Sequence, residues 1–275
     1  MPLTAVRHVR KMRGGAQAHL LEADDGHSYV VKFRNNPQHR RILVNELLAS
    51  TLLRYLQISA PETSLIHLDS GFLAANPDVC LTLGARRIPV EPGWQFGSRF
   101  PGDPSRTAVY DFLPDALLAQ VANLPDFRAI LVFDKWVGNA DGRQSVFYRA
   151  RVRREDAPDA RPGFVASMID NGFAFNGPHW DFPDSPLQGL YGRRAVYEHV
   201  RSFGDFEPWL NQVMYFPEEV MDRAWRAIPA DWVEGEEDEL ARLLEVLYDR
   251  RGRLPELISA CRGGRIDPFP NWKSA

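Results

Sequence analysis

The chain has 275 residues, of which 44% are hydrophobic and 25% are charged. This composition is typical of a folded protein and excludes a disordered chain. The net charge of −3 does not indicate direct nucleic-acid binding, and no apolar run predicts a transmembrane helix or a membrane partner. The two cysteines, Cys80 and Cys261, are far apart, so we expect no disulfide framework and no zinc site. Because the N-terminal residues also lack the apolar segment of a secretory signal, we expect a cytoplasmic protein.

The first third of the chain is predicted to form mostly strands. Residues 3–11 alternate loosely between polar and apolar, and segments 18–23 and 28–33 flank a turn sequence, which predicts a hairpin. Over residues 40–57 the apolar positions change to helical spacing. Strands are expected again around 63–69 and 79–90.

A Pro- and Gly-rich stretch, residues 89–104, is the predicted connection between two lobes. The rest is predicted to be mainly helical, beginning with a helix over 125–138 that starts at a proline and ends at a glycine. Two short strands are expected around 145–152 and 164–169, followed by helices near 193–203, 206–214, 217–227 and 237–250. We therefore expect an N-lobe over residues 1–100, with strands and one helix, and a mainly helical C-lobe over 101–275.

Four residues of the predicted N-lobe are candidates for binding a nucleotide. Gly14 and Gly15 lie between two predicted strands, where glycines would let the backbone approach phosphates, although a glycine pair also fits a plain turn. Lys32 follows two valines on a predicted strand, where its ammonium group would neutralise phosphates or lie exposed at a sheet edge. Glu46, on the following helix, would pair with Lys32 or face solvent.

Two acids in the predicted C-lobe complete the pattern. Asp141 ends the sequence Asn139-Ala140-Asp141 after the 125–138 helix, and Asp170 begins the sequence Asp170-Asn171-Gly172. Phosphoryl transfer needs one carboxylate to orient the attacking hydroxyl and another to hold Mg²⁺ against the phosphates. Each segment alone also fits a helix end or a β-turn, but their order, downstream of Lys32, favours phosphoryl transfer.

The sequence around these residues resembles the HipA-like kinase family, which is related to protein kinases and phosphatidylinositol kinases. The similar segments are GNAD (138–141), IDNGFAF (169–175) and VVKF (30–33). The resemblance covers most of the chain and implies a two-lobed, protein kinase-like α+β fold. In that fold the N-lobe is an antiparallel sheet with one helix, the C-lobe is mainly helical, and ATP and Mg²⁺ bind between the lobes.

The resemblance also implies a role for each candidate residue. Lys32 would contact the nucleotide phosphates, Gly14 and Gly15 would lie in the phosphate loop, Asp141 would match the catalytic aspartate and Asp170 the Mg²⁺-binding aspartate. The implied activity is transfer of the ATP γ-phosphate to a hydroxyl acceptor, a serine or threonine on a protein.

The sequence departs from the family pattern after Asp141. The family has an asparagine there that ligates a second metal, whereas Val146 stands five positions after Asp141. The nearest polar candidates for a metal ligand are Gln144 and Ser145, and Ser145 would align if the loop is one residue shorter. This departure supports an alternative interpretation, a nucleotide-binding pseudokinase or regulatory module without transfer activity. A third interpretation keeps the kinase fold and changes the acceptor to a lipid head group or a small molecule. No polybasic run or membrane-seeking helix favours a lipid.

Three further features stay open at the level of the sequence. Asp134 falls on the apolar stripe of the 125–138 helix, so its carboxylate either holds the catalytic loop or lies in water at the helix end. Residues 176–190 would lie where a kinase has its activation segment and substrate site, or form a plain loop. Because the family includes toxins paired with small DNA-binding antitoxins, the resemblance also suggests an antitoxin-like partner, although this chain is shorter than the toxin kinases.

Overall fold

The N-terminal part of the chain forms a closed barrel of five strands in the computed structural model, which describes residues 2–154 and 157–273. Around the barrel the order is β1 (Leu3–Lys11), β2 (His19–Ala23), β3 (Ser28–Lys32), β7 (Gly93–Arg99) and β4 (Thr63–Leu68). Neighbouring strands are antiparallel, except that β1 and β4 close the barrel as a parallel pair. The predicted hairpin of β2 and β3 is confirmed, and apolar side chains such as Leu21, Val31 and Ile66 fill the interior.

Strand β7 lies inside the Pro- and Gly-rich stretch that we expected to connect two lobes, so that expectation is wrong for its central part. The strand pairs with both β3 and β4, and Phe96 is opposite Lys32 on one side and Leu65 on the other. Glycine is required at position 97, because a Cβ there would lie 2.5 Å from Cγ1 of Ile66. Gly97 therefore permits close strand packing rather than a flexible connection.

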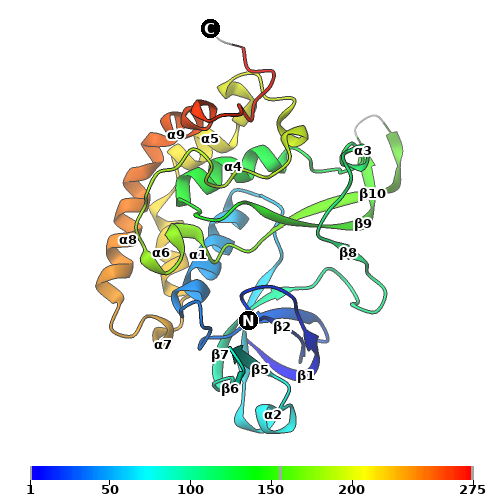
Figure 1. Cartoon of the computed structure of the whole chain (residues 1–275), viewed down its shortest axis with the longest axis vertical. Coiled ribbons are helices and arrows are strands. Elements are labelled where there is room, and N and C mark those ends of the chain that lie inside the picture. The colour runs from blue at the N-terminus through cyan, green and yellow to red at the C-terminus, as the bar shows by residue number, and fades with distance from the viewer. Residues whose placement is uncertain (1, 155–156, 274–275) are drawn as a thin grey trace.

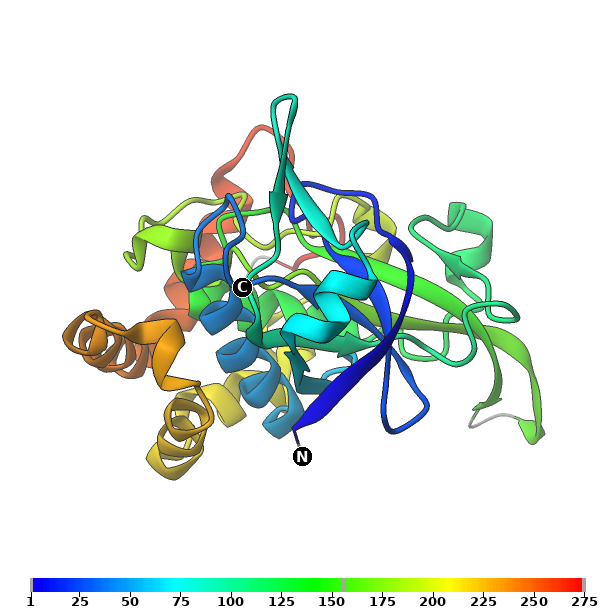
Figure 2. The ribbon, with the colours of Figure 1, turned by 90° about the horizontal axis from the view of Figure 1, so that it is seen from below.

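Two further elements lie on the outside of the barrel. They are the short helix α2 (Ser70–Ala75) and the hairpin of β5 (Cys80–Leu83) and β6 (Arg86–Pro89), which projects from the molecule in Figure 2. The N-terminal part thus contains α2 in addition to the one helix that was expected, α1 (Arg41–Tyr55).

Helix α1 is buried along most of its length, because it lies between the barrel and the helices of the C-terminal part (Figure 1). It packs against strand β7 on one side and against α6, α7 and the segment after Asp170 on the other. A helix covered on all sides needs apolar residues around its whole circumference, which explains why the sequence of α1 has no polar face.

Helix α4 (Asp126–Val137) is the central element of the C-terminal part and confirms the helix predicted over 125–138. Gly138 ends it in the left-handed conformation, with φ of 58°. The long hairpin of β9 (Gln144–Arg154) and β10 (Ala157–Ile169) follows, with the short strand β8 (Val109–Tyr110) at its edge and α3 (Asp115–Leu118) nearby. The two strands were predicted but are longer than expected, because residues 157–163, which were expected to lie between them, belong to β10. Residues 155–156 lie outside the described residues.

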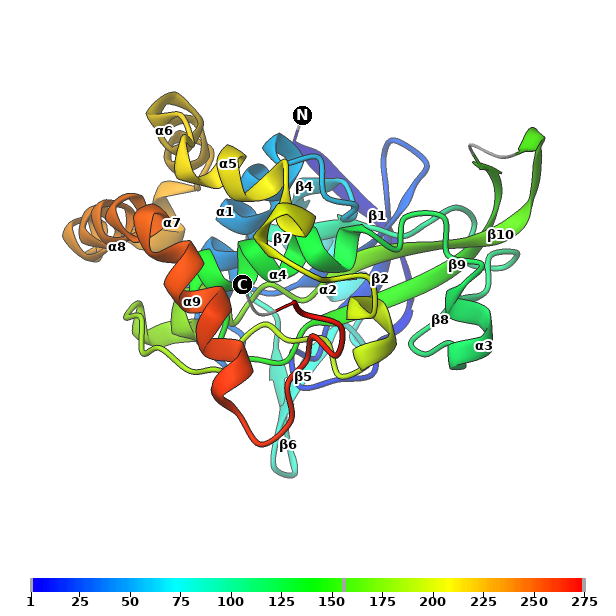
Figure 3. The ribbon, with the colours of Figure 1, turned by 90° about the horizontal axis from the view of Figure 1, so that it is seen from above.

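The remaining helices lie on one side of the molecule, beside α1 and α4 and away from the β9–β10 hairpin, as Figure 3 shows. In chain order they are α5 (Trp209–Met214), α6 (Glu218–Arg226), α7 (Ala230–Val233), α8 (Glu237–Arg250) and α9 (Leu254–Ala260), with 3-10 turns η1 (Ala174–His179), η2 (Arg194–Tyr197), η3 (Phe203–Phe206), η4 (Arg251–Arg253) and η5 (Cys261–Gly263). The predicted helix over 237–250 is confirmed. The helix predicted over 193–203 is wrong, because only the short turns η2 and η3 form there, and α9 was not predicted.

The molecule has two apolar cores. One fills the barrel, and the other joins α1 to α4 and the helices around it. The expected α+β architecture, with strands first and helices second, is confirmed. In the described part of the chain, no helix combines the length and hydropathy that crossing a bilayer requires.

Candidate active site

Three of the residues selected from the sequence meet where the barrel, α1 and the β9–β10 hairpin come together. Lys32 ends β3, Glu46 lies in the middle of α1, and Asp170 directly follows β10. Nζ of Lys32 donates hydrogen bonds to Oε1 of Glu46 and, at 2.8 Å, to Oδ1 of Asp170. The structure therefore joins three segments that are distant in the sequence through one ammonium group.

The charges of this cluster stabilise one another. Burial opposes the charge on Lys32, but the carboxylates of Glu46 and Asp170 outweigh burial and hold the pKa of Lys32 above its ordinary value. Burial likewise works against ionisation of Asp170, and the nearby Lys32 ammonium reverses that effect and lowers the pKa of Asp170. Lys32 and Asp170 are therefore both charged at neutral pH, as a site for phosphate groups and a divalent cation requires.

The backbone at Asp170 adopts an uncommon conformation. Its φ is 61°, in the left-handed region that non-glycine residues seldom occupy. Two residues later Gly172 passes close to α1, and a Cβ at that position would lie 2.6 Å from Cγ2 of Ile42. The glycine in the sequence Asp170-Asn171-Gly172 is thus explained by this close approach to α1 as well as by a turn.

Asn45, which the sequence reasoning did not select, fixes α1 to the segment after Asp170. Its Nδ2 lies 2.8 Å from the carbonyl oxygen of Gly172, 3.0 Å from that of Ala174 and 2.9 Å from that of Gly177. Its Oδ1 accepts a hydrogen bond of 2.8 Å from Nε1 of Trp180. Asn45 is fully buried, and an amide in that position needs such partners. No local signal singled out Asn45, because the same helix also buries the polar residues Glu46 and Ser50 and the partners of Asn45 lie more than 120 positions away.

Asp141 lies on the loop that follows α4 and is exposed to solvent. The backbone N–H of Asp141 donates to Oδ1 of Asn139 at 3.2 Å, and the backbone N–H of Ala140 donates to the carbonyl of Phe173 at 3.0 Å. The second bond links this loop to the segment after Asp170, so the predicted catalytic aspartate and the predicted Mg²⁺-binding aspartate lie on neighbouring segments. An exposed carboxylate held by its backbone is suited to orient a hydroxyl group.

Asp134 binds the loop that carries Asp141 and does not lie in water, which decides between the two alternatives left open by the sequence. Its carboxylate is fully buried and accepts from Nε of Arg143 at 2.8 Å, from Nη2 of the same residue and from Nδ2 of Asn139 at 3.0 Å. Nη1 of Arg143 also donates to the carbonyl of Ile169 at 2.8 Å and to Oδ1 of Asn171 at 3.0 Å. Arg143, which we did not predict, thus connects the loop of Asp141 to both neighbours of Asp170.

Gln144 and Ser145, the predicted replacements for the missing asparagine, are the first residues of β9. Nε2 of Gln144 donates to Oδ2 of Asp141 at 3.3 Å, and its amide also contributes to the lowered pKa of Asp170, after burial, Lys32 and Arg143. Gln144 therefore lies between the two acids. Oγ of Ser145 is buried without a hydrogen-bond partner among the described residues.

These residues fit a magnesium ion that arrives with a nucleotide. Mg²⁺ usually takes one or two carboxylates from the protein and completes its shell with phosphates and waters. Asp170 would supply the carboxylate, and the side-chain oxygens of Gln144 and Ser145 would be further ligands, since the hydroxyl of Ser145 has no partner among the described residues. The described residues contain no cluster of three or more His, Cys, Asp or Glu that would hold a metal alone.

Gly14 and Gly15 lie in the loop between β1 and β2, as expected, and Gly14 has φ of 116°. The amide of Gln17 anchors the end of this loop, since it pairs with both the carbonyl (2.8 Å) and the N–H (2.7 Å) of Thr82 on β5. Asn36, shortly after Lys32, donates to the carbonyl of Ala16 at 2.8 Å. The loop therefore packs against the chain that follows Lys32, while its contact with phosphates stays a prediction.

A cavity of about 460 Å³ opens next to Asp141. The loop that carries Asp141 forms one side of it, and η1 with the segment that follows forms the other. The lining residues are Ala140, Gly142, Asn176, Pro183, Asp184, Ser185, Leu187 and Gln188. Residues 176–190, left open above, thus lie beside the loop that carries Asp141.

Known structures share this fold at low sequence identity. A crystal structure of the Golgi casein kinase aligns with a TM-score of 0.53 and 15% identity, covering 95% of this chain and 74% of that one. The same kinase with Mn/ADP bound gives 0.50 and 14%, with the same coverage. The Helicobacter pylori proinflammatory kinase CtkA gives 0.48 and 14%, covering 92% of this chain and 99% of that one. The kinase-like fold expected from the sequence is confirmed.

A comparison with protein families is more specific. No curated protein matches the chain. The sequence model described as HipA-like kinase matches residues 6–147, more than half of the chain, and this region contains Lys32, Glu46 and Asp141. The resemblance seen in the sequence is thereby confirmed, and the chain belongs to the HipA-like kinase family.

Proposed function

We propose that this protein transfers the γ-phosphate of ATP to a hydroxyl group, on a serine or threonine of a protein. The observation that carries the proposal is the Lys32 ammonium held between Glu46 and Asp170, with the exposed carboxylate of Asp141 on the neighbouring loop. Family membership supports the kinase activity, while the acceptor class rests on the resemblance described above.

Each residue of the cluster has a defined task in this proposal. Lys32 neutralises the phosphates, and Glu46 fixes the position of its ammonium group. Asp170 would hold Mg²⁺, which supplies positive charge against the β- and γ-phosphates when bound. Asp141 orients the acceptor hydroxyl. Positioning and charge stabilisation account for most of the catalysis in this reaction class, so a fixed cluster of this kind is what the chemistry needs.

Gln144 and Ser145 take the place of the missing asparagine in this proposal. Val146 is half-buried on β9 and has no ligating atom, but Gln144 already contacts Asp141 and Ser145 has an uncommitted hydroxyl. The alternative, a nucleotide-binding pseudokinase, is favoured by Val146 alone. A cytoplasmic location and an antitoxin-like partner stay predictions of the sequence.

The test follows labelled phosphate. The wild-type protein is incubated with γ-labelled ATP and Mg²⁺, and both label on protein and release of phosphate are measured, beside Asp141→Ala and Asp170→Ala. Asp249→Asn, an exposed carboxylate on α8, is the matched control. We expect a loss of about 100-fold or more in the two site variants, typical of removing an acid–base or metal-binding group, and none in the control.

Two results would contradict the proposal in different ways. If ATP raises the melting temperature of the wild type but no phosphate is transferred or released, the pseudokinase is correct. If ATP neither reacts nor stabilises the protein, the nucleotide site itself is wrong.

A further inference from the structure

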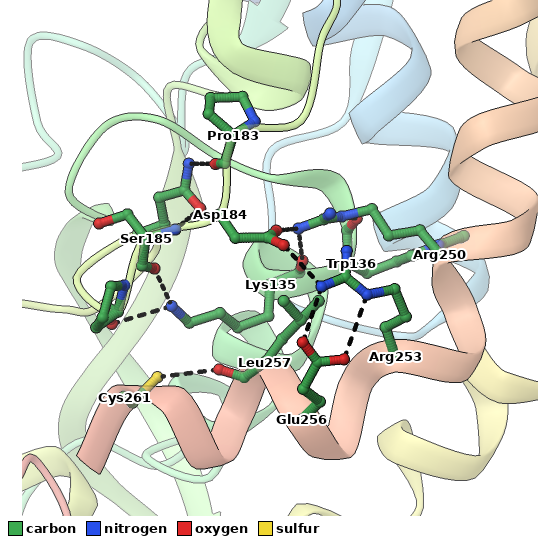
Figure 4. A network of polar contacts seen from close by, with 12 residues as sticks. Lys135, Trp136, Pro183, Asp184, Ser185, Arg250, Arg253, Glu256, Leu257 and Cys261 are labelled. Atoms are coloured by element: carbon green, nitrogen blue, oxygen red, sulfur yellow. Dashed lines mark hydrogen bonds and ion pairs between the residues drawn. The ribbon is translucent and has the colours of Figure 1, made fainter. Parts of the chain in front are cut away.

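The segment opposite Asp141 is held in place by charged residues from the end of the chain. Residues 183–188, here called the acceptor wall, form the outer side of the cavity of about 460 Å³. Oδ1 of Asp184 accepts from Nη2 of Arg250, and Oδ2 accepts from Nη2 of Arg253, both at 2.7 Å (Figure 4). Arg253 itself is held by Glu256 at 2.9 Å. We call the Asp184, Arg250 and Arg253 group the clasp.

Arg250 ties the clasp directly to the helix that leads into the catalytic loop. Its Nε donates to the carbonyl oxygen of Trp136 at 2.9 Å, and its Nη2 donates to that of Lys135 at 3.2 Å. These carbonyls belong to the last turn of α4, where backbone acceptors lack partners within the helix. One guanidinium therefore spans from the end of α4, just before Asp141, to the acceptor wall.

Lys135 adds a second connection between the same two segments. Its Nζ donates to the carbonyl oxygens of Ser185 and Pro186, each at 3.0 Å (Figure 4). Within the wall, the amide of Gln188 accepts from the N–H of Ser185 at 3.0 Å and donates to the carbonyl of Pro183 at 2.7 Å. The wall is thus fixed at its backbone as well as at the Asp184 side chain.

The clasp differs from an ordinary surface ion pair, because one member is buried. Arg250 is only 4% exposed, and its guanidinium also lies 5.1 Å from the centre of the Phe182 ring. The two arginines lower the pKa of Asp184 although its partial burial acts in the opposite direction. The buried Arg250 cannot leave this geometry without losing several charge-assisted hydrogen bonds, so opening the clasp costs free energy.

We propose that the clasp positions residues 183–188 as the binding surface for the phosphate acceptor, and that it does so without phosphorylation of this segment. In many kinases a phosphate on the corresponding segment recruits arginines and orders it. Here the carboxylate of Asp184 already supplies the negative charge that the arginines bind. Asp184 and Arg250 are accordingly positioning residues. The proposal rests on the proposed function, since it assigns the acceptor side of the same site.

The test uses Asp184→Asn, which keeps the shape of the side chain and removes its charge. The control is Asp222→Asn, in the exposed Asp222–Arg226 pair of α6. Phosphatase-treated protein, shown by intact mass to be free of phosphate, is assayed with γ-labelled ATP and a mixture of serine peptides with randomised flanking residues. Hydrogen exchange of the amides in 183–190 and the Kd for ADP with Mg²⁺ are measured on the same samples.

We expect Asp184→Asn to raise the peptide KM and the exchange rate of the wall by about tenfold or more, because hydrogen bonds to a charged group are lost. The Kd for ADP should change less than twofold, and Asp222→Asn should change nothing. The unphosphorylated wild type should be fully active.

Three outcomes would overturn the positioning role. They are an unchanged peptide KM in Asp184→Asn, an ADP affinity that falls as much as peptide transfer does, and a wild type that needs phosphate on residues 176–190 for activity. A wild type that binds ADP but transfers nothing to any peptide refutes the proposed function instead, and the exchange rates then show separately whether the clasp holds the wall.

Discussion

The substitution Asp134→Asn tests whether the buried polar core of the site is as tightly coupled as its geometry indicates. Asp134 and Arg143 are almost completely inaccessible to solvent, and the carboxylate engages both Nε and Nη2 of the guanidinium. Burial opposes the charge on Arg143, and the carboxylate of Asp134 outweighs it, so the pKa of Arg143 is raised. In the variant, the guanidinium remains charged and buried but loses the carboxylate that binds it directly, and only the more weakly acting charges of Glu46 and Asp170 remain.

The expected cost follows from the loss of this direct ion pair. Removing one partner of a buried ion pair costs about 3–5 kcal/mol, whereas an exposed pair contributes about 0–1 kcal/mol. Against a typical total stability of about 5–15 kcal/mol, this is a large fraction. For a chain of this size it corresponds to a decrease in melting temperature of about 10 °C.

Chemical denaturation of the wild type, Asp134→Asn and the control Asp78→Asn measures this cost. Asp78 pairs with Arg87 on the surface, with 79% and 60% of the two side chains exposed. A loss below about 1 kcal/mol in Asp134→Asn, similar to that of the control, would refute the argument, because it would mean that solvent reaches Arg143.

Three further predictions concern other parts of the structure. Burial and the neighbouring His8 lower the pKa of His19 to about 4, so between pH 8 and pH 5 the unfolded chain takes up a proton on His19 and the folded chain does not. The free energy of unfolding of the wild type should therefore fall by about 2 kcal/mol over this range and that of His19→Gln should not, and equal pH profiles of the two proteins in urea titrations would contradict this. Gly189 has φ of 69° and a Cβ there would lie 2.1 Å from Cβ of Asp134, so Gly189→Ala should cost about 3 kcal/mol in denaturation, whereas Gly192→Ala, with open space around it, should cost less than about 0.5 kcal/mol. Ser145→Ala removes a buried hydroxyl that has no partner among the described residues, so the free energy of unfolding should stay equal or rise by up to about 1 kcal/mol, and clear destabilisation would show that the hydroxyl has a partner. A weaker affinity of this variant for ATP with Mg²⁺ in calorimetry would assign the hydroxyl to the metal.

The residues that could be predicted from the sequence are those whose chemistry is visible locally. A lysine after two valines on a strand, a glutamate on the next helix and two acids at the ends of a helix and a strand each carry their signal within a few positions. The structure brings Lys32, Glu46 and Asp170 together as that pattern implied.

The residues that were missed act over long distances in the sequence. Asn45 binds carbonyls more than 120 positions away, and Arg250 binds the end of a helix more than 110 positions away. Nothing within a few residues of either one distinguishes it from a polar residue on a helix surface. The same holds for β7, where Pro and Gly suggested a connection, while the need for Gly97 arises only from Ile66 on the neighbouring strand.

The distribution of the two cores explains how the site is held together. The apolar residues of α1 pack into the same core as α4 and its neighbours, whereas the barrel has its own interior. Asn45 strengthens this arrangement, because it binds α1 to the segment after Asp170 and not to the barrel. Glu46 and Asp170 therefore belong to one rigid unit, and Lys32 belongs to the other. If the barrel moves relative to the helices to admit a nucleotide, Lys32 must change its contacts with the two carboxylates, which keep their positions. The contacts that join Arg34 to Asp231 and the carbonyl of Trp94 to Trp232 must change as well.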